Sequence, residues 1–274
     1  MSRTVAEKRA AFRAMHASGC FMLPNPWDVG SARYLASLGF SAIATTSAGF
    51  AWSSGRADNH VTRKSILDHL RTMVDATDLP VNADFENGFG EDPASVADSV
   101  KLAVATGIAG LSIEDSTGDP HAPLFPLDVA VERMKAARRA IDECAGDTLL
   151  IGRAENFFVG VSDLDDTIRR LKAYALAGAD CLYAPGIRTR EQIGAVVAAV
   201  APKPVNVLIG STSDFTQDEL AALGVRRISV GGALARSAWG GFMHAAQRLA
   251  MGRFDGFTGA APGQQLNAIF FENK

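Results

Sequence analysis

Eight short apolar stretches recur along this chain, and segments with helical character separate them. The stretches are CFMLP (20–24), AIATT (42–46), PVNAD (80–84), GLSIE (110–114), LLIGRA (149–154), DCLYA (180–184), PVNVLI (204–209) and RRISV (226–230). Strands that alternate with helices are typical of βα units in a parallel sheet. Eight such units in 274 residues indicate an α/β fold, a (β/α)8 TIM-type barrel, whose usual length is about 250 residues. An open doubly wound sheet is the alternative, but the G-x-G-x-x-G turn that it would need after an early strand is absent.

We expect one barrel domain over residues 1–274, because no proline- or serine-rich linker and no low-complexity tract divides the chain. An amphipathic helix is expected at the N-terminus, and residues 255–274 form a C-terminal helical extension. Thr216 and Glu219 have the spacing of a helix-capping box. The extension ends in Phe270 and Phe271, which we expect to pack against another surface, such as a neighbouring subunit.

The composition favours small-molecule chemistry. A formal net charge of −3 gives no electrostatic footprint for nucleic acid or for an anionic membrane. No apolar run reaches the length of a membrane span, and the N-terminus lacks the apolar core of a signal peptide. Cys20, Cys144 and Cys181 are odd in number and far apart, which fits a reducing cytoplasm better than a disulfide framework or a zinc site.

Two acids stand at the end of the third apolar stretch, in PVNADFENGFG. Residues two apart on a strand point to the same face, so Asp84 and Glu86 would project together and repel each other. Oxygen ligands favour a hard cation such as Mg²⁺, which keeps several waters and takes one or two carboxylates. Glu114 closes another apolar stretch, where a buried carboxylate is costly unless it is paired or near a metal. The alternative is that Asp84 and Glu86 are solvated loop residues.

Other polar residues follow the second and fifth stretches. Arg153 could be a salt-bridge partner of Glu155 or a bidentate clamp for a substrate carboxylate, and the sequence leaves both open. Thr46 and Ser47 could form a polar turn or an anion cradle made by backbone N–H groups. The sixth to eighth stretches end instead in small residues: Ala184-Pro185-Gly186, Gly210-Ser211 and Gly231-Gly232. One half of the barrel mouth should therefore carry the charge, while the other offers space.

The histidines add one candidate. His121 lies in the loop after the fourth stretch, where it could donate a proton from a mobile lid or simply be an exposed loop residue. His16 and His69 fall in expected helices, and we interpret both as surface residues.

These motifs carry a family likeness. LPNPWDVGSARYLASLGFSAIATTSAG, PVNADFENGFG, GLSIEDS, PLFPLDVAVERMKAAR, IGRAENF and GVRRISVGGALARSAW occur in this order. Over nearly its whole length the chain resembles the isocitrate lyase / phosphoenolpyruvate mutase superfamily. The resemblance implies a Mg²⁺-dependent barrel, with Mn²⁺ as a substitute, that makes or breaks C–C or P–C bonds next to a 2-oxo or enolpyruvyl carboxylate. It also implies a homo-oligomer, a tetramer or dimer that exchanges a C-terminal helix between subunits.

The resemblance assigns roles residue by residue. Asp84 matches the direct metal ligand, whereas Glu86, Glu114 and Asp58 match acids that hold the metal mostly through water. Thr46, Ser47 and Ala48 match the stretch that binds the oxyanion and carboxylate of the substrate, and Arg153 matches the arginine that binds its pyruvyl part. The candidate catalytic residues are Asp58, Arg153 and His121.

Departures from the family pattern narrow the reaction. The lyase branch carries a K-[KR]-C-G-H loop, whereas residues 115–126 read DSTGDPHAPLFP and contain neither cysteine nor lysine. The asparagine- and lysine-bearing loop of the phosphonate branch is absent as well, and Glu86 replaces the usual aspartate. We therefore expect a cytoplasmic lyase-type enzyme that forms an enolpyruvate-like intermediate from a small 2-oxo or 2-hydroxy carboxylate. The alternatives are a phosphonate mutase and a barrel that binds a 2-oxo acid without turning it over.

Overall fold

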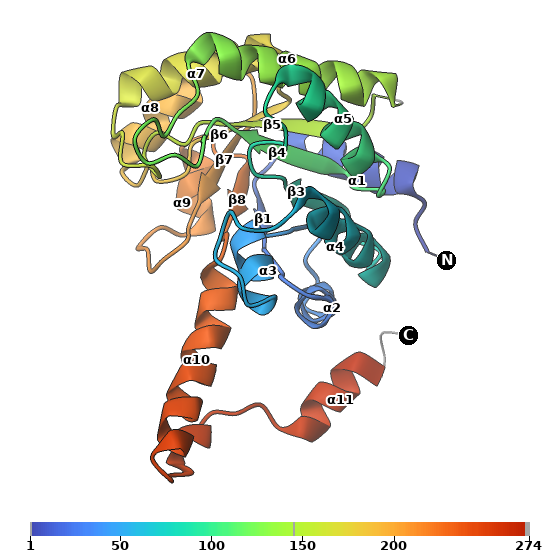
Figure 1. Cartoon of the computed structure of the whole chain (residues 1–274), viewed down its shortest axis with the longest axis vertical. Helices are drawn as coiled ribbons and strands as arrows, with labels where there is room; N and C mark the ends of the chain where they lie inside the picture. The colour runs from blue at the N-terminus through green and yellow to red at the C-terminus, as the bar shows by residue number, and fades with distance from the viewer. Residues whose placement is uncertain (1, 145, 272–274) are drawn as a thin grey trace.

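Eight parallel strands form the centre of the computed structural model, which describes residues 2–144 and 146–271 (Figure 1). The strands are β1 (Phe21–Leu23), β2 (Ile43–Ala44), β3 (Val81–Asp84), β4 (Gly110–Glu114), β5 (Leu149–Arg153), β6 (Cys181–Tyr183), β7 (Val205–Leu208) and β8 (Arg227–Ser229). Each lies inside one of the eight apolar stretches, so the prediction of strand number and position is confirmed.

The strand order closes the sheet into a nearly complete barrel. Each strand pairs with its sequence neighbour from β2 to β8, and β8 pairs with β1 through the register Phe21 to Arg227. Between β1 and β2 the described residues form no ladder, and one backbone hydrogen bond joins them, from Ala44 N–H to the Pro24 carbonyl at 3.0 Å. The TIM-type barrel is thus confirmed, with a seam between its first two strands.

Helices follow the strands and cover the outside of the barrel. They are α2 (Val29–Ser37), α3 (Ser47–Ser53), α4 (Arg63–Ala76), α5 (Pro93–Val104), α6 (Leu127–Glu143), α7 (Leu164–Leu176), α8 (Arg190–Val200) and α9 (Gln217–Ala222). The capping box of Thr216 and Glu219 begins α9, as its spacing predicts. The N-terminal helix α1 (Val5–Ala17) closes the bottom of the barrel, because its Phe12 is fully buried against Phe21 and Gly110.

Two histidines correct the sequence interpretation. His16 and His69 are each only 8% exposed, so their assignment to the surface is wrong. His16 lies one helical turn after Phe12, so it faces the same way; its Nδ1 lies 2.8 Å from the Phe12 carbonyl oxygen, and its ring packs against Phe21. His69 stacks on Phe50 at a centroid distance of 4.0 Å. Burial lowers the pKa of His16 to about 3 and that of His69 to about 4.

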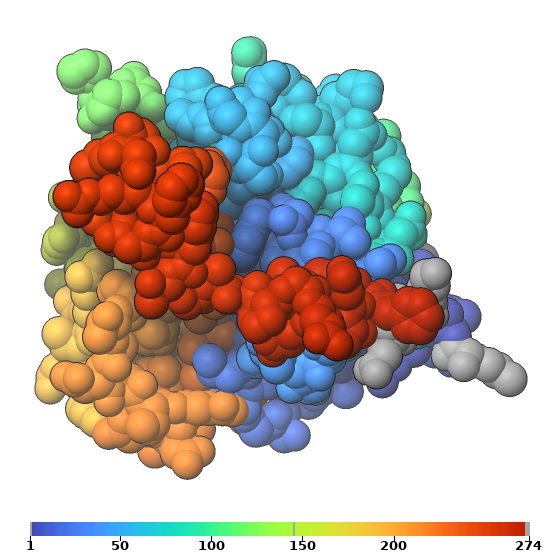
Figure 2. Space-filling view, turned by 90° about the horizontal axis from the view of Figure 1, so that it is seen from below, coloured from blue at the N-terminus to red at the C-terminus, as the bar shows by residue number. Residues whose placement is uncertain are grey.

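The C-terminal part leaves the barrel as an arm. Helix α10 (Ala233–Ala250) extends away from β8, a short turn η1 (Asp255–Phe257) follows, and α11 (Gly263–Phe271) returns to pack against α2 (Figures 1 and 2). Phe270 faces Gly30 of α2, whereas Trp239, Phe242 and Phe254 are exposed. Helix exchange between subunits stays a prediction.

In the described part of the chain, no helix has the length and apolarity to cross a membrane.

Candidate active site

A cavity of about 290 Å³ opens at the carboxyl ends of the strands, the end where enzymes of this fold place their chemistry. Six of the residues that the sequence singled out line it: Thr46, Ser47, Ala48, Asp58, Asp84 and Arg153. Further lining residues come from deeper in the barrel: Leu23, Asn82, Ser112, Tyr183 and Arg227. Most of the predicted site is therefore brought together, and part of the wall was not foreseen.

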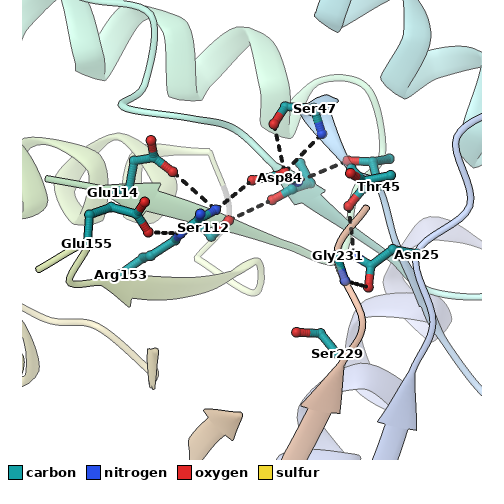
Figure 3. A network of polar contacts seen from close by, with 12 residues as sticks. Asn25, Thr45, Ser47, Asp84, Ser112, Glu114, Arg153, Glu155, Ser229 and Gly231 are labelled. Carbon is teal, nitrogen blue, oxygen red and sulfur yellow. Dashed lines mark hydrogen bonds and ion pairs between the residues drawn. The ribbon is translucent and has the colours of Figure 1, made fainter. Parts of the chain in front are cut away.

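Asp84 is held from two sides (Figure 3). Its Oδ2 accepts hydrogen bonds from Ser47 N–H and Ser47 Oγ, both at 2.9 Å. Ser47 is placed there because it opens α3, where Thr46 is the N-cap and accepts a hydrogen bond from Gly49 N–H. On the other side, Arg153 Nη1 lies 3.2 Å from Asp84 Oδ1. The aspartate thus points into the cavity in a fixed orientation.

Arg153 is surrounded by carboxylates. Its Nε donates to Glu155 Oε1 at 2.5 Å, and its Nη1 lies 3.1 Å from Glu114 Oε2 in addition to Asp84 (Figure 3). The guanidinium also lies over the Tyr183 ring, 5.2 Å from its centroid. Burial raises the pKa of Glu114 well above its usual range although the Arg153 charge opposes the shift. The structure contains the salt bridge to Glu155 that the sequence allowed; a clamp for substrate remains an expectation.

Glu86 and Asp58 lie near Asp84. Glu86 is buried, adopts the left-handed region at φ 47°, and its Oε1 has no hydrogen-bond partner in the described protein. Burial, followed by the charges of Asp84 and Asp58, raises the pKa of Glu86 to about 8. Asp58 lies at the exposed rim, where partial loss of water and the charge of Asp84 raise its pKa as well. Three acids therefore share one small region with too little positive charge.

This arrangement fits a hard cation that keeps part of its water shell. Within residues 2–144 and 146–271, no three acidic, histidine or cysteine side chains are grouped so that they could hold a metal ion by themselves. Asp84 Oδ1 accepts a single hydrogen bond and so retains a free lone pair, while the orphaned Oε1 of Glu86 lacks any donor. Mg²⁺ binds through one or two carboxylates and several waters rather than through an all-protein cage. Glu114, by contrast, is engaged with Arg153.

Asp115 is a site-supporting residue that sequence reasoning missed. It is buried and accepts hydrogen bonds from Glu155 N–H at 2.8 Å, Arg170 Nη1 at 3.1 Å and Tyr174 Oη at 2.5 Å. It therefore fixes the backbone of Glu155, which in turn holds Arg153. The sign of this role in the sequence was the acid pair at 114–115 directly after an apolar stretch.

His121 is exposed on its loop, where its backbone N–H donates to Asp119 Oδ1 at 2.8 Å, and it does not line the cavity.

A second cavity of about 460 Å³ lies beside the first, at the ends of β6 and β7. The two cavities share Phe158, Leu208, Gly210 and Arg236. The walls of the second combine apolar side chains with polar ones: Ile187, Ile193, Ile209 and Phe215 on the apolar side, and Arg188, Arg236, Ser211, Thr212 and Ser213 on the polar side. This space agrees with the small residues that end the later strands.

Comparisons with known proteins agree with this geometry. Residues 12–250 match the family model described as phosphoenolpyruvate phosphomutase. A solved structure from Burkholderia cenocepacia J2315, provisionally assigned as a lyase or mutase, is 49% identical, covers 97% of each chain and has a TM-score of 0.94. Oxaloacetate decarboxylase of Bradyrhizobium sp. is 33% identical over 175 residues, which is 62% of this chain and 58% of that protein. Oxaloacetate acetylhydrolase, solved with its product oxalate, is 26% identical over 96% of this chain and 94% of its own, with a TM-score of 0.84.

Proposed function

Because the chain belongs to the phosphoenolpyruvate phosphomutase family and is a lyase-type enzyme, we propose that it breaks a C–C bond in a small 2-oxo or 2-hydroxy carboxylate with the help of Mg²⁺. Cleavage or decarboxylation of an oxaloacetate-like acid is the reaction class that we favour, since two of the relatives above act on oxaloacetate. The observation that carries the proposal is Asp84, fixed by Ser47 and Arg153 and aimed into a cavity at the carboxyl ends of the strands.

The acids around Asp84 would hold the metal. Asp84 would bind it directly, and Glu86 and Asp58 would hold its waters. Glu114 would hold a water only through the carboxylate oxygen that does not face Arg153. When bound, Mg²⁺ polarises the 2-oxo group and stabilises negative charge that develops on its oxygen. Burial raises the pKa of Glu86, and metal affinity should increase with pH as the acids around the site lose their protons.

The protein's own groups orient the substrate. The start of α3, with Thr46, Ser47 and Ala48, presents hydroxyl and backbone N–H groups to the cavity, where preorganised donors can share the charge of an enolate. Arg153 would fix the substrate carboxylate so that the bond to be broken lies perpendicular to the plane of the carbonyl group, where it overlaps with the π system. Glu155, anchored through Asp115, keeps this guanidinium in place. Closure of loop 115–126 would bring His121 closer as a proton donor and exclude water.

Turnover assays with a defined panel test the proposal. The purified protein is offered oxaloacetate, a 3-alkyl malate and phosphonopyruvate with Mg²⁺, with Mn²⁺ or with EDTA. We expect metal-dependent release of a two- or three-carbon product from one of the first two. Asp84→Asn should lose at least about 10–100-fold in kcat/KM, the usual effect of changing a residue that supports a metal. Asp98→Asn, a surface aspartate of α5, is the matched control.

Stabilisation by oxalate gives an independent readout. Oxalate should raise the Tm of the wild type with Mg²⁺ but not with EDTA, and not in Asp84→Asn. Ligand at a hundred times its Kd adds about 2.7 kcal/mol. If phosphonopyruvate alone is turned over, the P–C alternative replaces this proposal. If oxalate and Mg²⁺ shift neither protein and no compound is turned over, the metal site assigned to Asp84 is wrong.

A further inference from the structure

One buried charge inside the barrel has no counter-charge. Arg227, the first residue of β8, is 2% exposed, and among the described residues no aspartate or glutamate forms an ion pair with it. The titratable groups that influence it are Cys181 and Tyr183, and it disfavours protonation of His16. All three are neutral near pH 7, because burial raises the pKa of Cys181 and of Tyr183 and lowers that of His16. A buried, unpaired charge is costly, and a negatively charged ligand bound beside the guanidinium would offset this cost.

The guanidinium lies on the floor of the active-site cavity. Its Nε donates to Asn206 Oδ1 at 2.8 Å and its Nη1 to Asn82 Oδ1 at 3.3 Å, while the side chain lines the cavity. These two amide oxygens are neutral, so they satisfy donors without balancing the charge. Arginine has five N–H donors, and those not used by Asn206 and Asn82 remain for a ligand.

The position of Arg227 relative to Asp84 defines the length of such a ligand. Asn82, which accepts a hydrogen bond from Arg227, stands two residues before Asp84 on β3, on the same face of the strand, so the two residues are offset by roughly 7 Å along the strand. A carboxylate one or two carbons beyond the reacting carbon reaches this depth once a charge-assisted hydrogen bond of about 2.8 Å is added.

The charge distribution also gives the ligand its orientation. At the mouth, Arg153 is already shared by Asp84, Glu114 and Glu155, whereas Arg227 on the floor is shared by no acid. A substrate whose single carboxylate binds at the mouth would leave the charge of Arg227 unbalanced. The second carboxylate of a dicarboxylate can balance it.

We propose that Arg227, with Asn82 and Asn206, forms an anion subsite that receives the second carboxylate of a 2-oxo or 2-hydroxy dicarboxylic acid. This inference rests on the proposed function, because it takes the reacting end of the substrate to lie at Asp84. The oxaloacetate-like acids favoured above are already dicarboxylic, and the inference adds Arg227 as the residue that binds their second carboxylate and selects for it.

A pair of stable ligands tests the subsite without turnover. Racemic malate and racemic lactate share a 2-hydroxy acid head, and malate adds one carboxylate. Calorimetric Kd values with Mg²⁺ should show malate binding at least tenfold more tightly than lactate to the wild type. Arg227→Gln should remove this preference while lactate binding is unchanged, and Arg227→Lys should restore part of it. Arg226→Gln is the matched control, because Arg226 donates to the Gly19 carbonyl and lines neither cavity.

Each outcome separates the two ideas. A wild type without preference for malate, or an Arg227→Gln variant that keeps it, overturns the subsite; the first result decides even if the variant does not fold. A variant that weakens malate and lactate equally shows a structural role instead. Arg227-dependent malate binding without turnover of any substrate would overturn the proposed reaction and leave the subsite standing.

Discussion

The two halves of the barrel mouth differ in how their side chains are held. On the side of β2 to β5, Asp84, Glu114 and Glu155 share one guanidinium, that of Arg153, within 3.2 Å. On the side of β6 to β8, the strands end in small residues, and Arg236 donates to the Gly210 carbonyl but pairs with no acid in the described chain. The first half fixes charges rigidly, as bond-breaking chemistry requires. The second half contains an open cavity, and a cavity of this kind can select substrates by the shape of the group that fills it.

The largest effect on stability is expected from breaking the charged half. Arg153→Met leaves three carboxylates without their common cation, and removal of one partner from a buried ion pair costs about 3–5 kcal/mol. Because burial already raises the pKa values of Glu114 and Glu155, these acids should take up protons in the variant. The loss should therefore be larger at pH 8 than at pH 5. Urea unfolding at both pH values measures it.

Arg236→Met provides the matched control in the open half. Its guanidinium makes one hydrogen bond, so we expect a change of at most about 1 kcal/mol at either pH. Equal losses for the two variants would mean that the contrast between the halves has no energetic basis.

A smaller effect is expected from His69, which supports the charged half from behind through its stack on Phe50 of α3. The unfolded chain binds a proton near pH 6.5, whereas the buried ring does so only near pH 4. Between these values the unfolded state holds more protons, so stability rises with pH, by up to about 3 kcal/mol across the window. The contribution is fully present above pH 6.5 and is lost as the pH falls towards 4.

His69→Phe keeps a stacked ring and removes the titration. The unfolding free energy of this variant should depend less on pH between 4 and 6.5 than that of the wild type. An unchanged slope would show that His69 is solvated enough to titrate normally.

The smallest effect is expected from filling the open half. An added Cβ at Gly210 would meet Leu208 and the Val230 carbonyl at ordinary contact distances of 3.7 and 3.8 Å. Gly210→Leu should therefore fold and place its side chain where the two cavities share their lining. The kcat/KM for a 3-alkyl substrate should fall about tenfold relative to oxaloacetate, since one or two methylenes in such a space are worth about 1–3 kcal/mol. Gly210→Ala should leave this ratio unchanged. An equal fall in kcat/KM for both substrates after Gly210→Leu would contradict a role of this space in substrate selection.

The fold could be predicted because each strand and helix is indicated by its own short stretch of sequence. Each strand is a short apolar run, and each helix has its own period and cap, as at Thr216. The burial of His16 was missed because an amphipathic helix shows which residues share a face, but not that a barrel bottom covers that face. The sign in the sequence that this face is buried was Phe12, which lies one helical turn before His16 and contacts its ring.

The site could be predicted where it follows strand ends. Asp84 and Arg153 close apolar runs, and all parallel strands end at the same rim. Arg227 could not be found in this way, because alternation along a strand shows that Arg226 and Arg227 face opposite sides without showing which faces inward. That choice depends on the register of β8 against β7 and β1, which is a property of the closed barrel.

The seam between β1 and β2 has a mechanical consequence. A ring of eight strands with ladders at every junction would be stiff, but here one junction depends on a single backbone hydrogen bond between Ala44 and Pro24, supported by Asn25 Nδ2 donating to the Thr45 carbonyl. The barrel is therefore a split ring. The edge of β2 leads within three residues into Thr46 and Ser47, so a spreading of the ring at this seam would widen the mouth on that side while every ladder between strands stays intact.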